Sequence, residues 1–156
     1  MTRDTSSDPG EHEGRRALMS VLASTPMPAL RQVWDRAGIA VEHVDIRRPE
    51  TGLVTVRGRI GGGGSAFNVG EATVTRASVR LATGETGHSY ALGRDIEKAR
   101  LCAVLDALWQ RAETRETVRS AVFVPLTESA ERDDARRRAE TAATKVDFFT
   151  MVRGED

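Results

Sequence analysis

The residues best suited by type to do chemistry lie in one short stretch, Gly87 to Asp95. It holds His88, Arg94 and Asp95: an imidazole that could move a proton, a guanidinium that could hold an anion, and a carboxylate. Asp95 also fits the N-cap of the helix predicted to follow, because its oxygen can accept backbone N–H groups there. His88 fits a structural role equally well. We therefore treat the three as candidates for a position next to a substrate, with both alternatives open.

Spacings typical of other catalytic or metal sites are absent from the sequence. His12, His43 and His88 are far apart and no HExxH pair occurs, so we expect no zinc site made by this chain alone. Cys102 is the only cysteine, which excludes an internal disulfide and a cysteine-only cluster. No GxSxG nucleophile motif is present. We expect no catalytic residue, no metal and no resident cofactor.

A glycine-rich stretch, Gly58 to Gly64, invites comparison with phosphate-binding loops. It lacks the Gly-Lys-Ser/Thr ending of a P-loop. It lies between two predicted strands, so no helix N-terminus would meet a phosphate. The pattern favours a flexible β connection, and a loop whose bare amides approach a ligand or partner is the alternative.

Arginines are predicted to gather on one face of a sheet. Side chains alternate between the two faces of a strand, so arginines interleaved with apolar residues should point away from the core. These are Arg57 and Arg59, among Val54, Val56 and Ile60, and Arg76 and Arg80, among Ala77, Val79 and Leu81. No acidic residue shares their parity within the predicted strands, so their charges would repel unless an anion compensates. An acidic partner surface or a polyphosphate would fit, and a solvated face is the alternative.

Composition limits the protein class. The 156 residues suffice for one domain, and the balance of 23 basic against 23 acidic residues argues against a generally basic nucleic-acid binder. Residues 1–14 are polar and acidic without an apolar signal segment, and no apolar run could span a bilayer. We expect a disordered leader over 1–14 and a cytoplasmic protein that binds neither membrane nor nucleic acid.

Apolar periodicity predicts the elements that position these residues. Helices are expected over 15–23, 28–37, 95–110 and 128–143, with Thr127 as the last N-cap after an apolar connection over 122–126. Strands are expected over 41–47, 53–60, 72–81 and 87–92. The predicted fold class is α+β, a single domain over 15–143 with a roughly four-stranded antiparallel sheet flanked by helices.

The C-terminal segment, 144–156, is unusually apolar for a chain end. It holds Val146, Phe148, Phe149, Met151 and Val152, and then Arg153. The segment either folds back to cover the sheet or docks into a partner as an extended tail. Docking is favoured because the predicted core is thin. Phe148, Phe149, Met151 and Arg153 therefore join the four arginines above as interface candidates.

Four stretches resemble the PhnG family, the G subunit of the bacterial carbon-phosphorus lyase core complex. They are TKVDFFTMVRGED (144–156), GLVTVRGRIGGGGSAFNVGEATVTR (52–76), GHSYALGRD (87–95) and DAL (106–108). The resemblance extends from residue 15 to the end of the chain and leaves out only the acidic leader.

The resemblance implies a subunit of a transferase that is inactive alone. With subunits H and I and the L protein it would replace the adenine of ATP by methylphosphonate, giving α-D-ribose 1-methylphosphonate 5-triphosphate. Subunit I would be the chief partner, with H and J in the same core complex, and the iron-sulfur cluster and S-adenosylmethionine would belong to subunit J. The family gives no established catalytic residue to transfer. The alternative is that Arg57, Arg59, His88 or Arg94 reaches the triphosphate.

Overall fold

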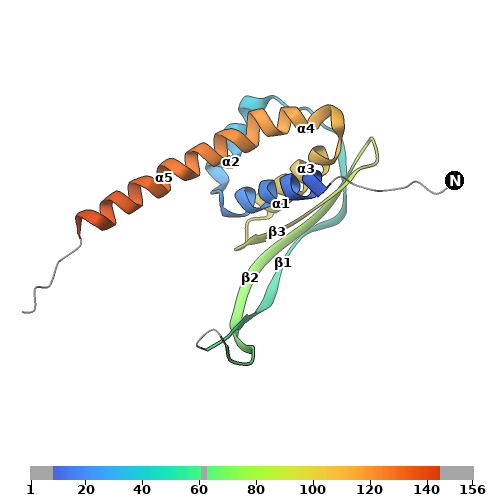
Figure 1. Cartoon of the computed structure of the whole chain (residues 1–156). Helices are drawn as coiled ribbons and strands as arrows, with labels where there is room; N and C mark the ends of the chain where they lie inside the picture. Colours follow the sequence, from blue (N-terminus) through green and yellow to red (C-terminus); the bar gives the residue numbers. More distant parts are fainter. Residues whose placement is uncertain (1–8, 61–62, 145–156) are drawn as a thin grey trace, which may run out of the picture.

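The computed structural model describes residues 9–60 and 63–144. Within them an antiparallel sheet of three strands, in the order β1-β2-β3, is packed against helices on one of its faces (Figure 1). The elements are α1 (Pro9–Ser24), α2 (Met27–Ala37), β1 (His43–Gly58), β2 (Phe67–Leu81), β3 (Thr86–Leu92), α3 (Ile96–Gln110), α4 (Ala112–Val118), the π-helical turn η1 (Arg119–Phe123) and α5 (Val124–Ala143). The α+β class is as predicted.

The sheet has one strand fewer than predicted. The expected strands over 41–47 and 53–60 are a single strand, β1, because no turn separates them: Gly52 pairs directly with Val74 of β2. The register shifts between Asp45 and Arg47 and again between Arg47 and Glu50. These irregularities accommodate Pro49, which has no N–H to donate and is tolerated on an edge strand. Gly52, expected to separate two strands, therefore lies inside one.

Helix α3 is the centre of the core. Asp95 caps it as predicted, accepting a hydrogen bond of 2.8 Å from the Lys98 backbone N–H. The helix is buried on nearly all sides, and it packs on the sheet face formed by Ala77, Val79 and Leu81, whose inward direction is confirmed. Gly87 of β3 permits the close approach, since a Cβ there would lie 2.6 Å from the Ala107 backbone nitrogen.

Two N-terminal helices complete the core. Helix α2 follows the prediction, with Pro28 in its first turn and Gly38 in the left-handed conformation, φ +60°, at its C-terminus. Helix α1 begins at Pro9 rather than near Arg15, so residues 9–14, expected in the disordered leader, are helical. Gly14 lies against the indole of Trp109, where a Cβ would be 3.1 Å from the ring. Residues 1–8 of the leader lie outside the described residues.

The C-terminal helices form one continuous helical run from Ala112 to Ala143. The predicted apolar connection over 122–126 is wrong, because Pro125 lies in the first turn of α5, directly after the π turn η1. That position tolerates a residue without an N–H. Thr127 is not an N-cap: its hydroxyl donates to the Phe123 carbonyl inside the helical run. The rest of α5 extends away from the core (Figure 1).

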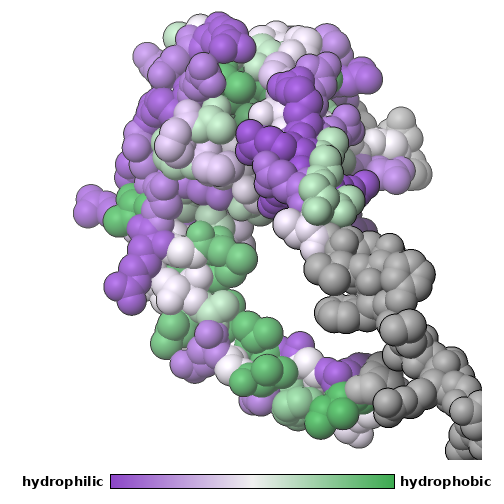
Figure 2. Space-filling model, turned by 90° about the vertical axis from the view of Figure 1, so that its left-hand side faces the viewer, coloured by the Kyte–Doolittle hydropathy of each residue, from purple (hydrophilic) through white to green (hydrophobic). Residues whose placement is uncertain are grey.

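A β-hairpin arm projects from the domain. Strand β3 ends at Leu92 opposite Val74, so beyond this point β1 and β2 continue without it. We call residues 51–60 and 63–74 the arm. Figure 2 shows apolar side chains gathered along it. Those exposed by more than a third are Leu53, Val54, Val56, Ile60, Phe67 and Val69.

Candidate functional site

The sheet has a face that helices do not cover. The register and the alternation of side chains place these residues on the side opposite α3, and we call this side the uncovered face. It comprises Val44, Arg47, Glu50, Gly52, Val54 and Val56 of β1, Gly70, Ala72, Val74, Arg76, Ser78 and Arg80 of β2, and Thr86, His88, Tyr90 and Leu92 of β3. Tyr90 is 62% exposed and Leu92 is 72% exposed, whereas Thr75 and Val79 on the other side are fully buried.

Arg76 and Arg80 lie on the uncovered face, as predicted, but an acidic residue lies there too. Glu50 accepts hydrogen bonds from Arg47 at 2.9 Å and from Arg76 at 2.7 Å. The hydrogen bond from Arg47, followed by that from Arg76, lowers the pKa of Glu50. The expectation of a face without carboxylates is wrong because β1 runs on through residue 50, which lies between the predicted strands 41–47 and 53–60.

Arg57 and Arg59 do not lie in one row with Arg76 and Arg80, although the sequence predicted all four on one face. Val54 and Val56 pair with Ala72 and Gly70 on the uncovered face, so they do not face the core as assumed. The register shifts again after Val56, and Arg57 lies opposite Asn68. Arg59 bends back to the carbonyl of Gly64 at 3.4 Å. Both arginines belong to the arm.

The candidates His88, Arg94 and Asp95 are not brought together. His88 lies on the uncovered face, where its Nδ1 is 2.9 Å from the Ser78 hydroxyl. Asp95 uses its carboxylate to cap α3, and Arg94 is exposed after the end of β3. His88 lies four residues before Leu92, the last residue of β3, and four strand residues span about 13 Å. Asp95 follows beyond that end of the strand, so His88 and Asp95 do not form a common site.

An apolar strip runs along the uncovered face from the arm to β3. From the arm towards β3, the strip comprises Val56 and Val54 of β1, then Val74 of β2 with its partner Leu92 of β3, and then Tyr90 of β3. At the β3 end of the strip the Arg76 guanidinium donates a hydrogen bond to the Tyr90 oxygen, and this contact is the largest cause of the raised pKa of Arg76. We call Val54, Val56, Val74, Leu92 and Tyr90 the apolar strip.

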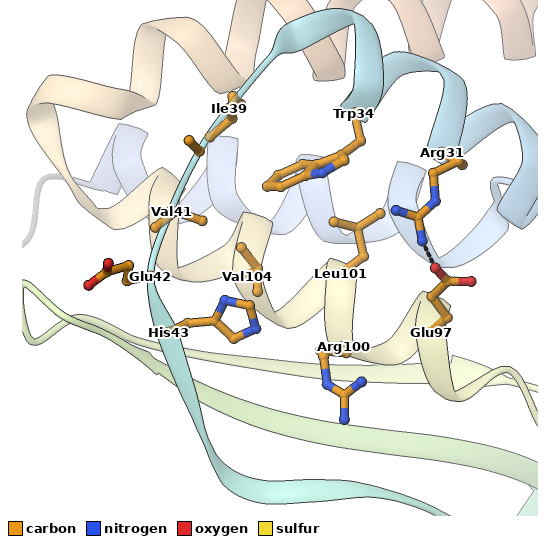
Figure 3. A pocket seen from close by; sticks show the side chains of 11 residues that line it. Arg31, Trp34, Ile39, Val41, Glu42, His43, Glu97, Arg100, Leu101 and Val104 are labelled. Carbon is orange, nitrogen blue, oxygen red and sulfur yellow. Dashed lines mark ion pairs between the residues drawn. The ribbon is translucent and has the colours of Figure 1, made fainter.

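The structure also contains a pocket of about 790 Å³ between α2, residues 39–43 and α3 (Figure 3). Trp34, Leu101 and Val104 form apolar walls. The arginines at its rim are already paired, Arg31 with Glu97 and Arg100 with Asp45. The pocket therefore suits an apolar group better than an anion. Sequence patterns missed it because its walls come from separate segments.

Neither a metal site nor a membrane span is found in the part of the chain that the structure describes. No cluster of three or more His, Cys, Asp or Glu side chains there could hold an ion. None of the helices over these residues has the length and hydropathy needed to cross a bilayer.

Comparison with known proteins relates this chain to a family. A family model described as phosphonate metabolism protein PhnG matches residues 13–154. The chain belongs to the PhnG family. It is 51% identical, over 152 residues, to the alpha-D-ribose 1-methylphosphonate 5-triphosphate synthase subunit PhnG of Rhizobium meliloti (strain 1021). That alignment covers 97% of this chain and 96% of the relative.

The PhnG match extends beyond the residues described here. The interface candidates Phe148, Phe149, Met151 and Arg153 fall inside the matched range but outside the described residues, so their roles stay predictions. The uncovered face and the arm lie wholly inside that range as well. The sequence signal for the face is the alternation in β2. The sequence did not predict the arm, because it predicted two separate strands where β1 is continuous.

Proposed function

We propose that this PhnG-family chain is a non-catalytic subunit of α-D-ribose 1-methylphosphonate 5-triphosphate synthase, required for assembly and activity of the complex. One observation carries the proposal: 51% identity to a PhnG subunit of that synthase, over nearly the full length of both chains. Fold analogy alone would not support a function, but this similarity extends over the surfaces as well as the core.

The described residues suit a subunit that binds other proteins. The apolar arm and the uncovered face offer extended contact surface, whereas His88, Arg94 and Asp95 do not converge on a reacting atom. In this proposal subunit I is the chief partner, H and J share the core complex, and the L protein acts with them in the cytoplasm. ATP and methylphosphonate are substrates of the complex, and the iron-sulfur cluster and S-adenosylmethionine belong to another subunit.

A second candidate function is direct contact with the triphosphate. It is favoured by the position of His88 and Ser78 on the uncovered face beside Arg47 and Arg80. Guanidinium groups bind phosphate oxygens well, and an imidazole can donate to them. Under this candidate, Arg57, Arg59, His88 or Arg94 would affect turnover rather than assembly.

The test is reconstitution of the complex with and without this chain. The chain is co-expressed with subunits H, I and J, the complex is isolated by size-exclusion chromatography, and adenine release from ATP is measured with methylphosphonate and the L protein. We expect co-elution, and loss of adenine release when the chain is omitted. A chain without residues 146–156 should fail to co-elute, because its apolar tail is expected to dock into a partner.

Different outcomes separate the two candidates. Elution of the intact chain alone, with undiminished adenine release in its absence, would contradict the subunit role. Alanine at Arg57, Arg59, His88 or Arg94, each introduced singly into an assembled complex, should leave turnover unchanged if the chain is non-catalytic. A loss of turnover with intact assembly would support contact with the triphosphate instead.

A further inference from the structure

At two positions on the uncovered face, nothing in the described chain explains why the residue is glycine. For most other glycines the reason is clear: Gly38 and Gly93 have positive φ, and a Cβ on Gly58 would lie 2.6 Å from the Val69 side chain. At Gly52 and Gly70, by contrast, φ is outside the left-handed region and a Cβ would meet no atom within 4 Å. Glycine inside a strand weakens it, because it has no side chain to pack and more backbone freedom to lose.

The two glycines lie within the apolar strip. Gly52 pairs with the half-buried Val74, and Gly70 pairs with the exposed Val56, so each leaves a gap beside a valine. Gly70 adjoins the register shift after Val56, but its φ shows that this irregularity does not require glycine. A glycine that its own chain does not need is typical of a place where another backbone approaches closely. The gaps therefore indicate something that lies directly on the sheet.

We propose that the uncovered face is the docking site for another protein subunit, whose backbone packs closely over Gly52 and Gly70 with apolar side chains on the strip. This inference rests on the proposed function and identifies the surface through which the chain enters its complex. The occupant presents an apolar centre because Val54, Val74 and Leu92 form the middle of the strip. An antiparallel sheet commonly leaves one face to solvent, but such a face is then polar, whereas this one carries the apolar strip.

Charge indicates that the occupant is a different protein with carboxylates at its margin. The uncovered face holds Arg47, Arg76 and Arg80 against the single carboxylate of Glu50 among the paired residues. A symmetric dimer through this face would apply the same patch to itself and bring these arginines together. Like charges in that position oppose association, whereas a partner rich in Asp and Glu would pair with Arg80.

The experiment fills the gaps and measures binding and folding separately. Gly52→Val and Gly70→Val are made in the full chain, with Thr117→Val as a control because Thr117 is exposed on α4, outside both the arm and the uncovered face. Affinity for the complex of the remaining subunits is measured by biolayer interferometry, and the isolated chains are melted. We expect at least a tenfold loss of affinity in each valine variant, an unchanged or higher melting temperature, and less than a twofold change in the control.

The charge of the occupant is tested with the same binding partners. Arg80→Glu should slow association at low salt, and the difference from the unsubstituted chain should shrink as salt is raised. Arg119→Glu, on η1 away from the sheet, makes the same change in net charge and should leave the association rate unaltered. Equal effects of the two reversals would contradict a carboxylate-bearing partner at this face.

The outcomes distinguish failure of this inference from failure of the proposed function. If the unsubstituted chain joins no complex, the proposed function is overturned, and so is the docking proposal, which depends on it. If it joins and the valine variants bind equally well, or Thr117→Val weakens binding as much, only the assignment of this face is overturned. Should a valine variant fold poorly, Gly52→Ala, which adds one methyl group into open space, replaces it with the same expected loss. A homodimer of the isolated chain that Gly52→Val dissociates would also overturn the inference.

Discussion

At the scale of single residues, Asp106 joins three elements of the core. Its carboxylate lies on α3 and accepts hydrogen bonds from Arg15 of α1, at 2.6 Å to Nε and 2.7 Å to a terminal nitrogen. It also accepts the His88 backbone N–H of β3 at 2.9 Å. The side chain is almost completely buried, and the carboxylate raises the pKa of Arg15 chiefly through these hydrogen bonds. Asp106 thereby connects α1 and α3 to β3, one of the strands that form the uncovered face.

Replacing Asp106 by alanine should therefore destabilise the fold. We expect a loss of about 3 kcal/mol in the free energy of unfolding, because the His88 N–H and the Arg15 guanidinium lose their shared, buried acceptor. Urea unfolding followed by circular dichroism measures it. Asp133→Ala, which removes an exposed i,i+3 pair with Arg136, is the control and should cost less than about 0.5 kcal/mol. Equal losses in the two variants would refute the central role of Asp106.

Cys102 is a core residue of α3 and not a reactive thiol. Burial raises the pKa of its thiol from 9.0 to about 12. The thiol therefore stays protonated at neutral pH, and a protonated, buried thiol is a poor nucleophile. The structure gives this cysteine a packing role.

The raised pKa of Cys102 predicts a loss of stability in alkali. The folded state holds the thiol proton more tightly than the unfolded state, so this contribution is complete below pH 9 and is lost as the pH rises towards about 12. The free energy of unfolding is measured from pH 8 to 11 in the unsubstituted chain and in Cys102→Ala. The fall with pH should be shallower in the variant, and a thiol reagent should label the unsubstituted chain only when it is unfolded. Parallel pH profiles, or rapid labelling of the native chain, would show that the thiol is not protected.

At the scale of elements, α5 depends on its first turns for attachment. Leu126 is its only buried residue among those described. Further along, its charged side chains pair with one another, as Arg138 does with Asp134 at 2.5 Å and Arg132 with Glu128 at 3.9 Å. Exposed pairs of this kind add little to stability. The second half of α5 therefore extends the chain outward without contributing to the core.

A chain that ends at residue 130 should fold almost as stably as one that ends at residue 144. We expect a loss below about 1 kcal/mol, because the removed part of α5 contributes exposed ion pairs and no buried apolar side chain. Leu126→Ala in the full chain is the comparison and should cost about 2–5 kcal/mol, since it leaves a cavity against the core. Chemical denaturation measures both variants. A truncated chain as unstable as Leu126→Ala would show that the outer half of α5 packs on the domain.

Elements were predictable where one local signal dominated. The Asp95 cap, the stripe of α3 and Gly38 after α2 each fix a boundary through contacts within a few residues. The predictions were wrong at Gly52 and Pro125, which local rules treat as breakers. Gly52 pairs with Val74 inside β1, and the first turn of α5 after η1 accommodates Pro125, so both elements continue. These solutions depend on neighbouring segments that a local pattern does not contain.

At the scale of the whole molecule, the two faces of the sheet have different environments. Helix α3 buries one face, and the other carries the apolar strip, three arginines and two unexplained glycines. The arm extends this second face past the end of β3 (Figure 1). An isolated two-stranded hairpin is only marginally stable in water. An arm of this length with apolar side chains is therefore better suited to a covered position in an assembly than to permanent exposure.

The sequence by itself determined the α+β class, the inward residues of β2, the cap of α3 and the family. These follow from periodicity, from capping chemistry and from stretches such as 52–76, all of which are local properties of the chain. Only the tertiary structure decided that Glu50 neutralises Arg76, that His88 and Asp95 lie apart, and that Gly52 and Gly70 face open space on an uncovered face. The physical reason is register: a shift of one residue turns a side chain to the other face of a sheet, and pairing between distant segments sets that shift.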